Sequence, residues 1–260
     1  MEKSFKHLDA TIFNIEKFNY HAMTGKKYFK AKNRIDFILS VVILIAAFPF
    51  MLLISILLTV ILKSFPLIIQ KRGITEDNQV FYMYKFRTIG NPSLGDKINP
   101  YNRINSENIL FKSSLSKYVP AFCRWLRKTG FDELPQIFNV LKGEMSLVGP
   151  RPLTISDLKV LKNNYPQHYQ IRDSISIKPG ITGMWQVFGN RNEGIENLIS
   201  LDLYYNEQTS LSVDLRILLS TILSVARGKH SDAVFSCIPS PANYNKEWNT
   251  LSSTHSLTNF

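Results

Sequence analysis

The longest hydrophobic pattern in the sequence is an uncharged run of 26 residues from Phe37 to Leu62. As a continuous helix this run would be about 39 Å long, whereas the hydrocarbon core of a bilayer is about 30 Å thick. A helix in a soluble core rarely needs that length, and a cleavable signal peptide would be shorter and nearer the N-terminus. The run therefore predicts a membrane segment, which we place at residues 34–62.

Two features bear on how this segment sits in the membrane. Pro49 lies at its middle, where a proline kinks or breaks a helix. Lysine and arginine residues flank the run on both sides, and the positive-inside rule places such flanks in the cytoplasm. A hairpin that enters and leaves on one face satisfies both flanks, whereas a proline-kinked single span satisfies only one. The residues alone leave both arrangements open.

Shorter patterns follow in the rest of the chain. Residues 67–89 contain two apolar stretches around a polar turn and many strand-forming residues, so they predict a small β element. Residues 90–110 have the composition of a loop. In residues 211–225, Asp214 and Arg216 interrupt the apolar positions, which predicts an amphipathic helix. Such a helix lies on a membrane surface or, more commonly, packs in the core.

These patterns divide the chain into four parts. A basic segment, residues 1–33, precedes the membrane segment. Residues 63–235 contain the helical patterns and the small β element and predict one folded domain. The tail, residues 236–260, is rich in Asn, Ser, Thr and Pro and is predicted to be disordered.

Composition narrows the class of protein. The chain has 260 residues, of which 45% are hydrophobic and 20% charged, which is typical of a folded protein. Cys123 and Cys237 form no CxxC pair and the five histidines form no HExxH motif, so nothing indicates a disulfide scaffold or a zinc site. The net charge is +11, and +7 of it precedes residue 73. This position beside the apolar run favours anionic membrane lipids over nucleic acid as the partner.

The first candidate chemical site is the pair Asp132–Glu133. Asp132 is a good helix N-cap, and Gly143 closes the helix that follows. The apolar residues between them have helical spacing: Leu134, Ile137, Phe138 and Leu141. Helix capping is the simplest interpretation. The chemical alternative is that an ionised Asp132 attacks phosphorus while Glu133 binds Mg²⁺, at a helix N-terminus that attracts phosphate.

Two later segments also contain candidate residues. Arg151 stands between two prolines in GPRP, and this restricted backbone suits a guanidinium that grips phosphate. A tight turn with a solvated arginine explains the same residues. The segment KPGITGMWQV, residues 178–187, is a glycine-rich turn that leads into an apolar stretch and is weak evidence by itself.

Taken together, four segments resemble the bacterial sugar transferases, the monotopic phosphoglycosyl transferases. In order they are KFRT, LRKTGFDELPQIFNVLKGEMSLVGPRP, KPGITGMWQV and DLYYNEQTSLSVDLRILLSTI. The match covers roughly residues 30–233. It implies a mostly helical α/β fold with a small β element and a re-entrant helix–break–helix, with Pro49 at the break. It also implies a bacterial inner membrane location with the catalytic domain, residues 63–235, on the cytoplasmic face.

The resemblance further implies an activity. The enzyme would transfer sugar-1-phosphate from a UDP-sugar to undecaprenyl phosphate and release UMP, at the first membrane step of a capsule, O-antigen or exopolysaccharide. Asp132 would be the nucleophile that forms a covalent phosphosugar intermediate, and Glu133 would bind the Mg²⁺ cofactor. The implied substrate-binding residues are Lys85, Arg87, Arg127, Arg151 and Asp214.

Some positions depart from the family pattern. The family often has Gly-Arg-Asn after the Trp-Gln-Val region, whereas here Arg191 comes one place later. Either Arg191 does the same work or that contact is missing. Phe48 replaces a serine that often precedes the membrane proline. The sequence does not reveal the sugar, the glycan or whether the chain forms a homo-oligomer.

Three other functions were weighed. A membrane-anchored scaffold without activity conflicts with the intact Asp-Glu pair and GPRP, and an assay of UMP release discriminates it. A nucleic-acid binder is suggested only by the charge, which clusters beside the apolar run. A polytopic polyprenol-phosphate transferase needs many membrane spans, whereas the sequence has one apolar run of that length.

Overall fold

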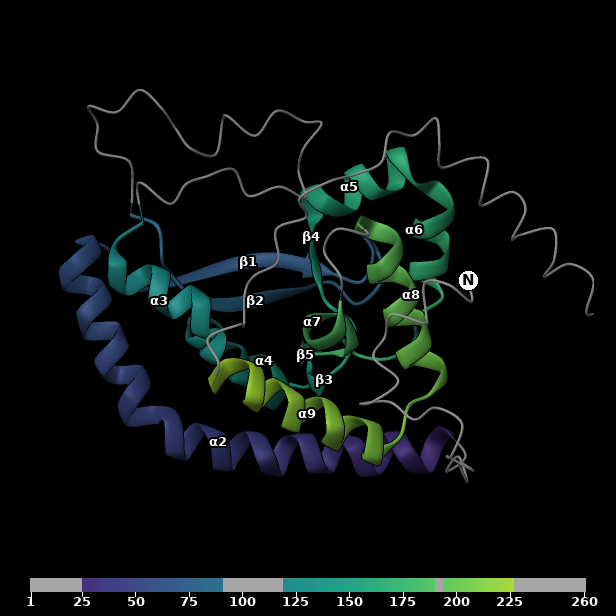
Figure 1. Cartoon of the computed structure of the whole chain (residues 1–260), viewed down its shortest axis with the longest axis horizontal. Coiled ribbons are helices and arrows are strands. Elements are labelled where there is room, and N and C mark those ends of the chain that lie inside the picture. The colour runs from purple at the N-terminus through teal and green to yellow at the C-terminus, as the bar shows by residue number, and fades with distance from the viewer. Residues whose placement is uncertain (1–24, 91–118, 190–193, 227–260) are drawn as a thin grey trace, which may run out of the picture.

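The computed structural model describes residues 25–90, 119–189 and 194–226. Within these ranges the fold is mostly helical with two small sheets (Figure 1), which confirms the predicted content of a helical protein with a small β element. Several sequence-based predictions fall outside the described residues: residues 1–24 of the basic segment, the loop from residue 91, Arg191, and the tail 236–260.

The long N-terminal helix α2 (Gly25–Leu62) contains the predicted membrane segment and has Pro49 in its interior. Figure 1 shows α2 as a bent helix, with one arm along the base of the molecule and the other rising toward α3 (Ala121–Thr129). A proline inside a helix removes a backbone hydrogen bond and clashes with the preceding turn, which accounts for a bend. The helix is bent and continuous, so the predicted helix–break–helix is not confirmed.

Most apolar side chains of α2 face outward. By length and composition the stretch Tyr28–Leu62 can cross a membrane, and only 17% of its apolar window is buried. A helix in the core of a soluble protein would be largely buried, because its apolar side chains must leave water. An exposed apolar surface of this extent is compatible with membrane association.

Both arms of α2 nevertheless contact the rest of the protein. In the second arm, Met51, Ile54 and Leu58 pack in one apolar cluster with side chains of α3. The first arm reaches α9 (Leu211–Ala226) through an ion pair between Lys32 and Asp214. The bent helix therefore holds the domain at two separate places.

The β element predicted at residues 67–89 is a hairpin. Strand β1 (Leu67–Gly73) pairs antiparallel with β2 (Phe81–Phe86), and β4 (Leu153–Thr154) pairs with the other edge of β1. The register places Ile68 opposite Lys85 and Arg72 opposite Phe81. The predicted β element is therefore confirmed, and β2 is an edge strand that carries Lys85 near its end.

A second sheet places the GPRP motif beside the segment KPGITG, a contact that was not predicted from the sequence. Strand β3 (Ser146–Val148) leads into GPRP and pairs in parallel with β5 (Gly180–Thr182) of the segment KPGITG. The two backbones meet closely, since a Cβ on Gly149 would lie 2.2 Å from the Lys178 carbonyl oxygen and one on Gly180 would lie 2.1 Å from the Gly149 nitrogen. Glycine at both positions is therefore required for this approach.

The other helices surround these sheets. They are α4 (Ile137–Leu141), α5 (Ile155–Asn164), α6 (Pro166–Asp173), α7 (Met184–Phe188) and α8 (Gly194–Glu207). Thr154 begins α5 with a capping box, in which its hydroxyl accepts from the backbone of Asp157. Together with α9 and the sheets, these helices enclose the main apolar core.

Helix α9 confirms that residues 211–225 form a helix, but both of its faces carry apolar side chains. Val213 and Ile217 are buried on its inner face. Its outer face is also apolar, with four side chains more than half exposed: Leu215, Leu219, Ile222 and Leu223. The helix therefore packs against the core on one side and presents an apolar surface on the other.

Candidate active site

Asp132 and Glu133 lie in the first turn of the short 3₁₀ helix η3 (Phe131–Gln136), between α3 and α4. Gly130 ends α3 with a φ of 76° and also stands at the N-cap of η3, where no side chain caps the helix. The prediction that Asp132 is the N-cap is therefore wrong, because a left-handed residue precedes it and glycine adopts that conformation without strain. Both carboxylates are instead buried inside the turn.

Lys85 brings the opposite charge to this pair. Its Nζ lies 2.9 Å from Oδ2 of Asp132 and 3.1 Å from Oε1 of Glu133. All three side chains are less than a tenth exposed. The two carboxylates and one ammonium carry a net charge of −1 in a buried place, where charges interact more strongly than in water. The structure thus gathers three of the predicted site residues.

Asn139 holds this arrangement together. Its Oδ1 accepts from the Tyr84 nitrogen at 3.1 Å, and its Nδ2 donates to the Tyr82 carbonyl at 2.7 Å. The side chain is fully buried, so both hydrogen bonds are protected from water. Asn139 therefore ties α4, which continues η3, to the free edge of β2, the strand that carries Lys85. Sequence analysis missed this residue because a lone asparagine in a helical pattern gives no signal.

Two of the predicted arginines are close in sequence to these residues: Arg127 precedes η3, and Arg87 follows Lys85. Arg127 is in the last turn of α3. Burial raises the pKa of the Cys123 thiol, while the charge of Arg127 lowers it and that of Asp132 raises it, so both charges act on the same thiol. Arg87 follows β2, and its Nε donates to the Phe65 carbonyl at 2.9 Å. This hydrogen bond joins Arg87 to the segment that leads into β1.

Arg151 lies over an aromatic ring. Its guanidinium carbon is 5.6 Å from the centre of the Trp185 ring, a cation–π distance. The backbone carbonyl of Arg151 accepts a hydrogen bond from Arg172, which is itself ion-paired with Asp202. The arginine of GPRP is thus fixed at its side chain and at its backbone.

Asp214 belongs to a different cluster. Its carboxylate accepts hydrogen bonds from Lys32, Tyr28 and Tyr205, so it joins α9 to α2 and α8. In the sequence, Lys32 is one of the basic residues that precede the apolar run. Its spacing of four from Asp36, to which it is also paired at 3.6 Å, is the signal that could have identified it.

An apolar cavity of about 200 Å³ reaches the acidic pair. Side chains of α2 and α9 form two of its sides and η3 supplies Phe131, Glu133 and Leu134. Glu133 is the one acidic residue among the residues that line it. The cavity therefore connects the apolar surface of α2 and α9 with one carboxylate of the site.

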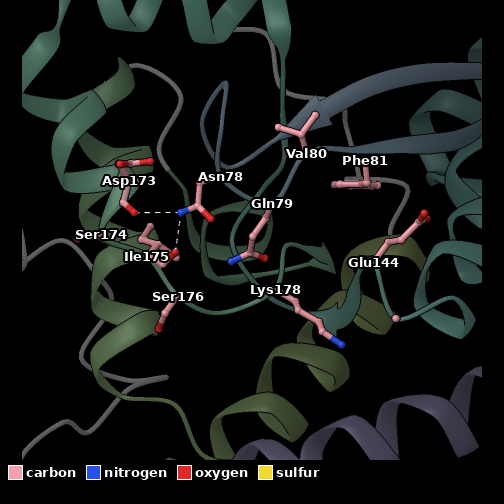
Figure 2. A pocket seen from close by; sticks show the side chains of 11 residues that line it. Asn78, Gln79, Val80, Phe81, Glu144, Asp173, Ser174, Ile175, Ser176 and Lys178 are labelled. Atoms are coloured by element: carbon pink, nitrogen blue, oxygen red, sulfur yellow. Dashed lines mark hydrogen bonds between the residues drawn. The ribbon is translucent and has the colours of Figure 1, made fainter.

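A larger cavity of about 690 Å³ lies elsewhere, between the β1–β2 turn and the end of α6. Figure 2 shows Asn78 on its wall, donating to the carbonyls of Asp173 and Ile175. Gln79, Glu144 and Lys178 are among its polar lining, and neither Asp132 nor Glu133 lines it. The acidic pair is thus associated with the smaller, apolar cavity.

Within the described residues, no group of three or more His, Cys, Asp or Glu side chains could hold a metal ion. A cation at Asp132 and Glu133 would therefore need oxygen ligands from a substrate as well. This is the usual situation of Mg²⁺, which binds one or two carboxylates together with substrate phosphates. The two carboxylates fit that kind of site.

Comparison with known proteins points to one family. The family model of the bacterial sugar transferases matches residues 27–228. The undecaprenyl-phosphate galactose phosphotransferase of Salmonella typhimurium is 34% identical over 201 residues, which are 75% of this chain and 40% of that protein. The exopolysaccharide production protein ExoY of Sinorhizobium fredii is 31% identical over 77% of this chain and 88% of its own length.

A further relative is the UDP-glucose:undecaprenyl-phosphate glucose-1-phosphate transferase of Xanthomonas campestris, 35% identical over 75% of this chain and 38% of that protein. This chain thus spans about two fifths of the length of the Salmonella and Xanthomonas relatives. The residues that the family model matches include η3, GPRP and both strands of the parallel pair.

Proposed function

Because this chain belongs to the bacterial sugar transferase family, we propose that it transfers sugar-1-phosphate from a UDP-sugar to undecaprenyl phosphate and releases UMP. The observation that carries the proposal is the buried contact of Lys85 with both Asp132 and Glu133. The names of the Salmonella and Xanthomonas relatives support the lipid acceptor and, for the latter, a UDP-sugar donor.

In the first step, a carboxylate oxygen of Asp132 attacks the phosphorus that carries the sugar. The bond from this phosphorus to the bridging oxygen breaks, UMP leaves with the bonding electrons, and an aspartyl phosphosugar remains on the enzyme. An anion that approaches a diphosphate is repelled, and nearby cations lower this cost. Lys85 supplies one such charge, and we assign the same role to the guanidinium groups of Arg127 and Arg151.

In the second step, a phosphate oxygen of the lipid acceptor attacks the same phosphorus. The bond between phosphorus and the Asp132 oxygen breaks, which gives the undecaprenyl-diphosphate sugar and restores the carboxylate. No net proton or electron is required, because the diphosphate bond of the UDP-sugar is exchanged, through the acyl phosphate on Asp132, for the diphosphate bond of the lipid product. Ping-pong kinetics are the expected consequence.

We assign Mg²⁺ to Glu133, together with phosphate oxygens of the donor. When bound, the ion supplies positive charge to the phosphoryl oxygens. The net charge of −1 of the acidic pair with Lys85 favours a further cation. The Lys85 ammonium, within about 3 Å of each carboxylate, offsets part of the repulsion between them.

The acceptor approaches through the apolar cavity beside Glu133 in this proposal. Side chains of α2 and α9 line that cavity, and these two helices also present outward apolar surfaces. We propose that α2 enters and leaves a bacterial inner membrane on the cytoplasmic face, with the bend at Pro49. The contacts of both arms of α2 with the domain support this arrangement. The basic residues on both flanks of the apolar run support it as well, because they attract anionic lipids of the cytoplasmic leaflet.

The experiment is an assay of UMP release with undecaprenyl phosphate and a panel of UDP-sugars. Asp132→Asn should abolish turnover, whereas Asp77→Asn, at an exposed aspartate of the hairpin turn, should leave it intact. Radiolabelled donor without acceptor should label the wild type on Asp132 but not the Asn variant. Absence of UMP release with every donor would favour the scaffold function, and full activity of Asp132→Asn would exclude the aspartyl intermediate.

A further inference from the structure

A buried polar cluster joins the membrane helix α2 to α8 and α9. Oδ2 of Asp214 accepts from Lys32 Nζ at 2.7 Å and from the Tyr28 hydroxyl at 3.1 Å. Oδ1 of Asp214 accepts from the Tyr205 hydroxyl at 2.5 Å. All four residues are at least nine-tenths buried, so the cluster is a built feature of the core and not a surface contact.

The same cluster reaches strand β3, which leads to GPRP. The Ser146 hydroxyl donates to Asp36 at 2.6 Å, and Lys32 lies between Asp36 and Asp214. The Tyr205 hydroxyl also lies 3.1 Å from the Val148 carbonyl. Four elements are therefore held by directional polar contacts at one point: α2, α8, α9 and β3.

The two helices that meet in this cluster also form walls of the apolar cavity at Glu133. Asp214 stands one turn before Leu218, the first residue of α9 that lines the cavity. The α2 residues that line it are Ile43, Leu44, Ala47 and Met51. Apolar contacts alone are non-directional, so they allow one helix to slide along the other. A charged hydrogen bond between the helices fixes their relative position.

We propose that Lys32, Asp214 and Tyr205 form a latch that sets the position of α9 on α2 and thereby the shape of the acceptor cavity. This inference rests on the proposed function, since it assigns the cavity to the lipid acceptor. In it Asp214 is a positioning residue that acts through the cavity walls. The side-chain hydrogen bonds of Asp214 go to Tyr28, Lys32 and Tyr205, and not to the acidic pair.

The test separates the two half-reactions in the full chain, reconstituted in vesicles that contain undecaprenyl phosphate. Lys32→Met removes the charge at nearly unchanged length, and Tyr205→Phe removes only the hydroxyl. Lys30→Met is the matched control, because Lys30 is exposed on the same helix. Labelling of Asp132 by the donor without acceptor should keep its wild-type rate in all three variants.

Transfer to the lipid should respond differently. We expect the KM for undecaprenyl phosphate to rise about tenfold in Lys32→Met and by a smaller factor in Tyr205→Phe, with the control unchanged. Tenfold corresponds to about 1.4 kcal/mol. Replacing both partners, in Lys32→Met with Asp214→Asn, should restore part of the loss, because the single change leaves a buried carboxylate without its ammonium.

Two outcomes would overturn the latch. One is an equal fall of donor labelling and lipid transfer, which would indicate general damage to the domain. The other is an unchanged KM for undecaprenyl phosphate in Tyr205→Phe. This substitution removes one hydroxyl, so the variant should fold even if Lys32→Met does not. Failure of the wild type to become labelled would instead reject the proposed function, so the two failures are distinguishable.

Discussion

Arg172 and Asp202 form an ion pair at 2.6 Å in which both side chains are at most 1% exposed. The guanidinium also donates to the Ile74 carbonyl at 2.7 Å and to the carbonyl of Arg151. One side chain of α6 therefore connects α8, the β1–β2 turn and the GPRP loop. Burial raises the pKa of Asp202 to about 6, and Arg172 opposes that rise.

Breaking this pair from one side should be costly. Arg172→Met leaves the Asp202 carboxylate buried without its partner, and the expected loss of unfolding free energy is about 3–5 kcal/mol. The double variant Arg172→Met with Asp202→Leu should lose less than the single variant, because no uncompensated charge remains. Denaturant unfolding in detergent measures the unfolding free energy of the single and the double variant. Equal losses in the single and double variants would show that the guanidinium's backbone contacts matter more than the ion pair.

His168 should make stability depend on pH. Burial lowers the pKa of its imidazole to about 4, below the value of about 6.5 in an unfolded chain. Between these values the unfolded state binds more protons, so the stabilising contribution is complete above pH 6.5 and is lost as the pH falls toward 4. The unfolding free energy of the wild type should therefore fall relative to that of His168→Gln over this window. If the unfolding free energies of the two proteins changed equally with pH, His168 would not be the source of the pH dependence.

Lys85 should be important for the rate of the proposed reaction. Lys85→Met removes the ammonium that contacts both Asp132 and Glu133. We expect kcat for UMP release to fall by about 10²-fold or more, since removal of one stabilising charge or donor typically costs that much. Lys142→Met, at an exposed lysine, is the control and should keep its activity.

Metal dependence tests the role given to Glu133. Chelation with EDTA should stop UMP release, and added Mg²⁺ should restore it. Glu133→Gln removes a charged ligand, so it should raise the Mg²⁺ concentration needed for half-maximal activity by about tenfold or more. Undiminished activity in EDTA would remove the metal from the proposal.

Pro49→Leu should alter the course of α2. The change restores a backbone donor and relieves the clash with the preceding turn, which favours a straight helix. A straight helix would carry the basic N-terminal flank across the membrane. We expect the wild-type N-terminus in the cytoplasm, and a fraction outside together with lower activity in Pro49→Leu. Labelling of a cysteine placed at Lys6 measures this from each side, with Phe48→Leu as the neighbouring control.

Elements that depend only on neighbouring residues in the sequence could be predicted from local patterns. The hairpin at 67–89 and the helix at 211–225 follow from alternation and amphipathicity, and the family motifs located Lys85 and the acidic pair. Within the helix predicted after Asp132, however, Phe138 is 37% exposed while Asn139 is fully buried. The chain forms a 3₁₀ turn before α4, and this change of helical period rotates the buried face.

Contacts between distant segments could not be predicted. Lys32 and Asp214 are 182 residues apart, and no periodicity links a charge at the edge of an apolar run to another on a late helix. The parallel strands β3 and β5 have three residues each, too few for an alternation to be recognised. Both features are decided by tertiary packing.

The contact between Gly149 and Gly180 has a practical consequence for altering the enzyme. A methyl group at either position would overlap backbone atoms at 2.1–2.2 Å, and backbone cannot move aside as a flexible side chain can. If the proposed function holds, libraries built to change the UDP-sugar donor should therefore keep glycine at both positions. The varied positions should be other residues of the same two loops, because every variant would then keep the close approach of the two backbones.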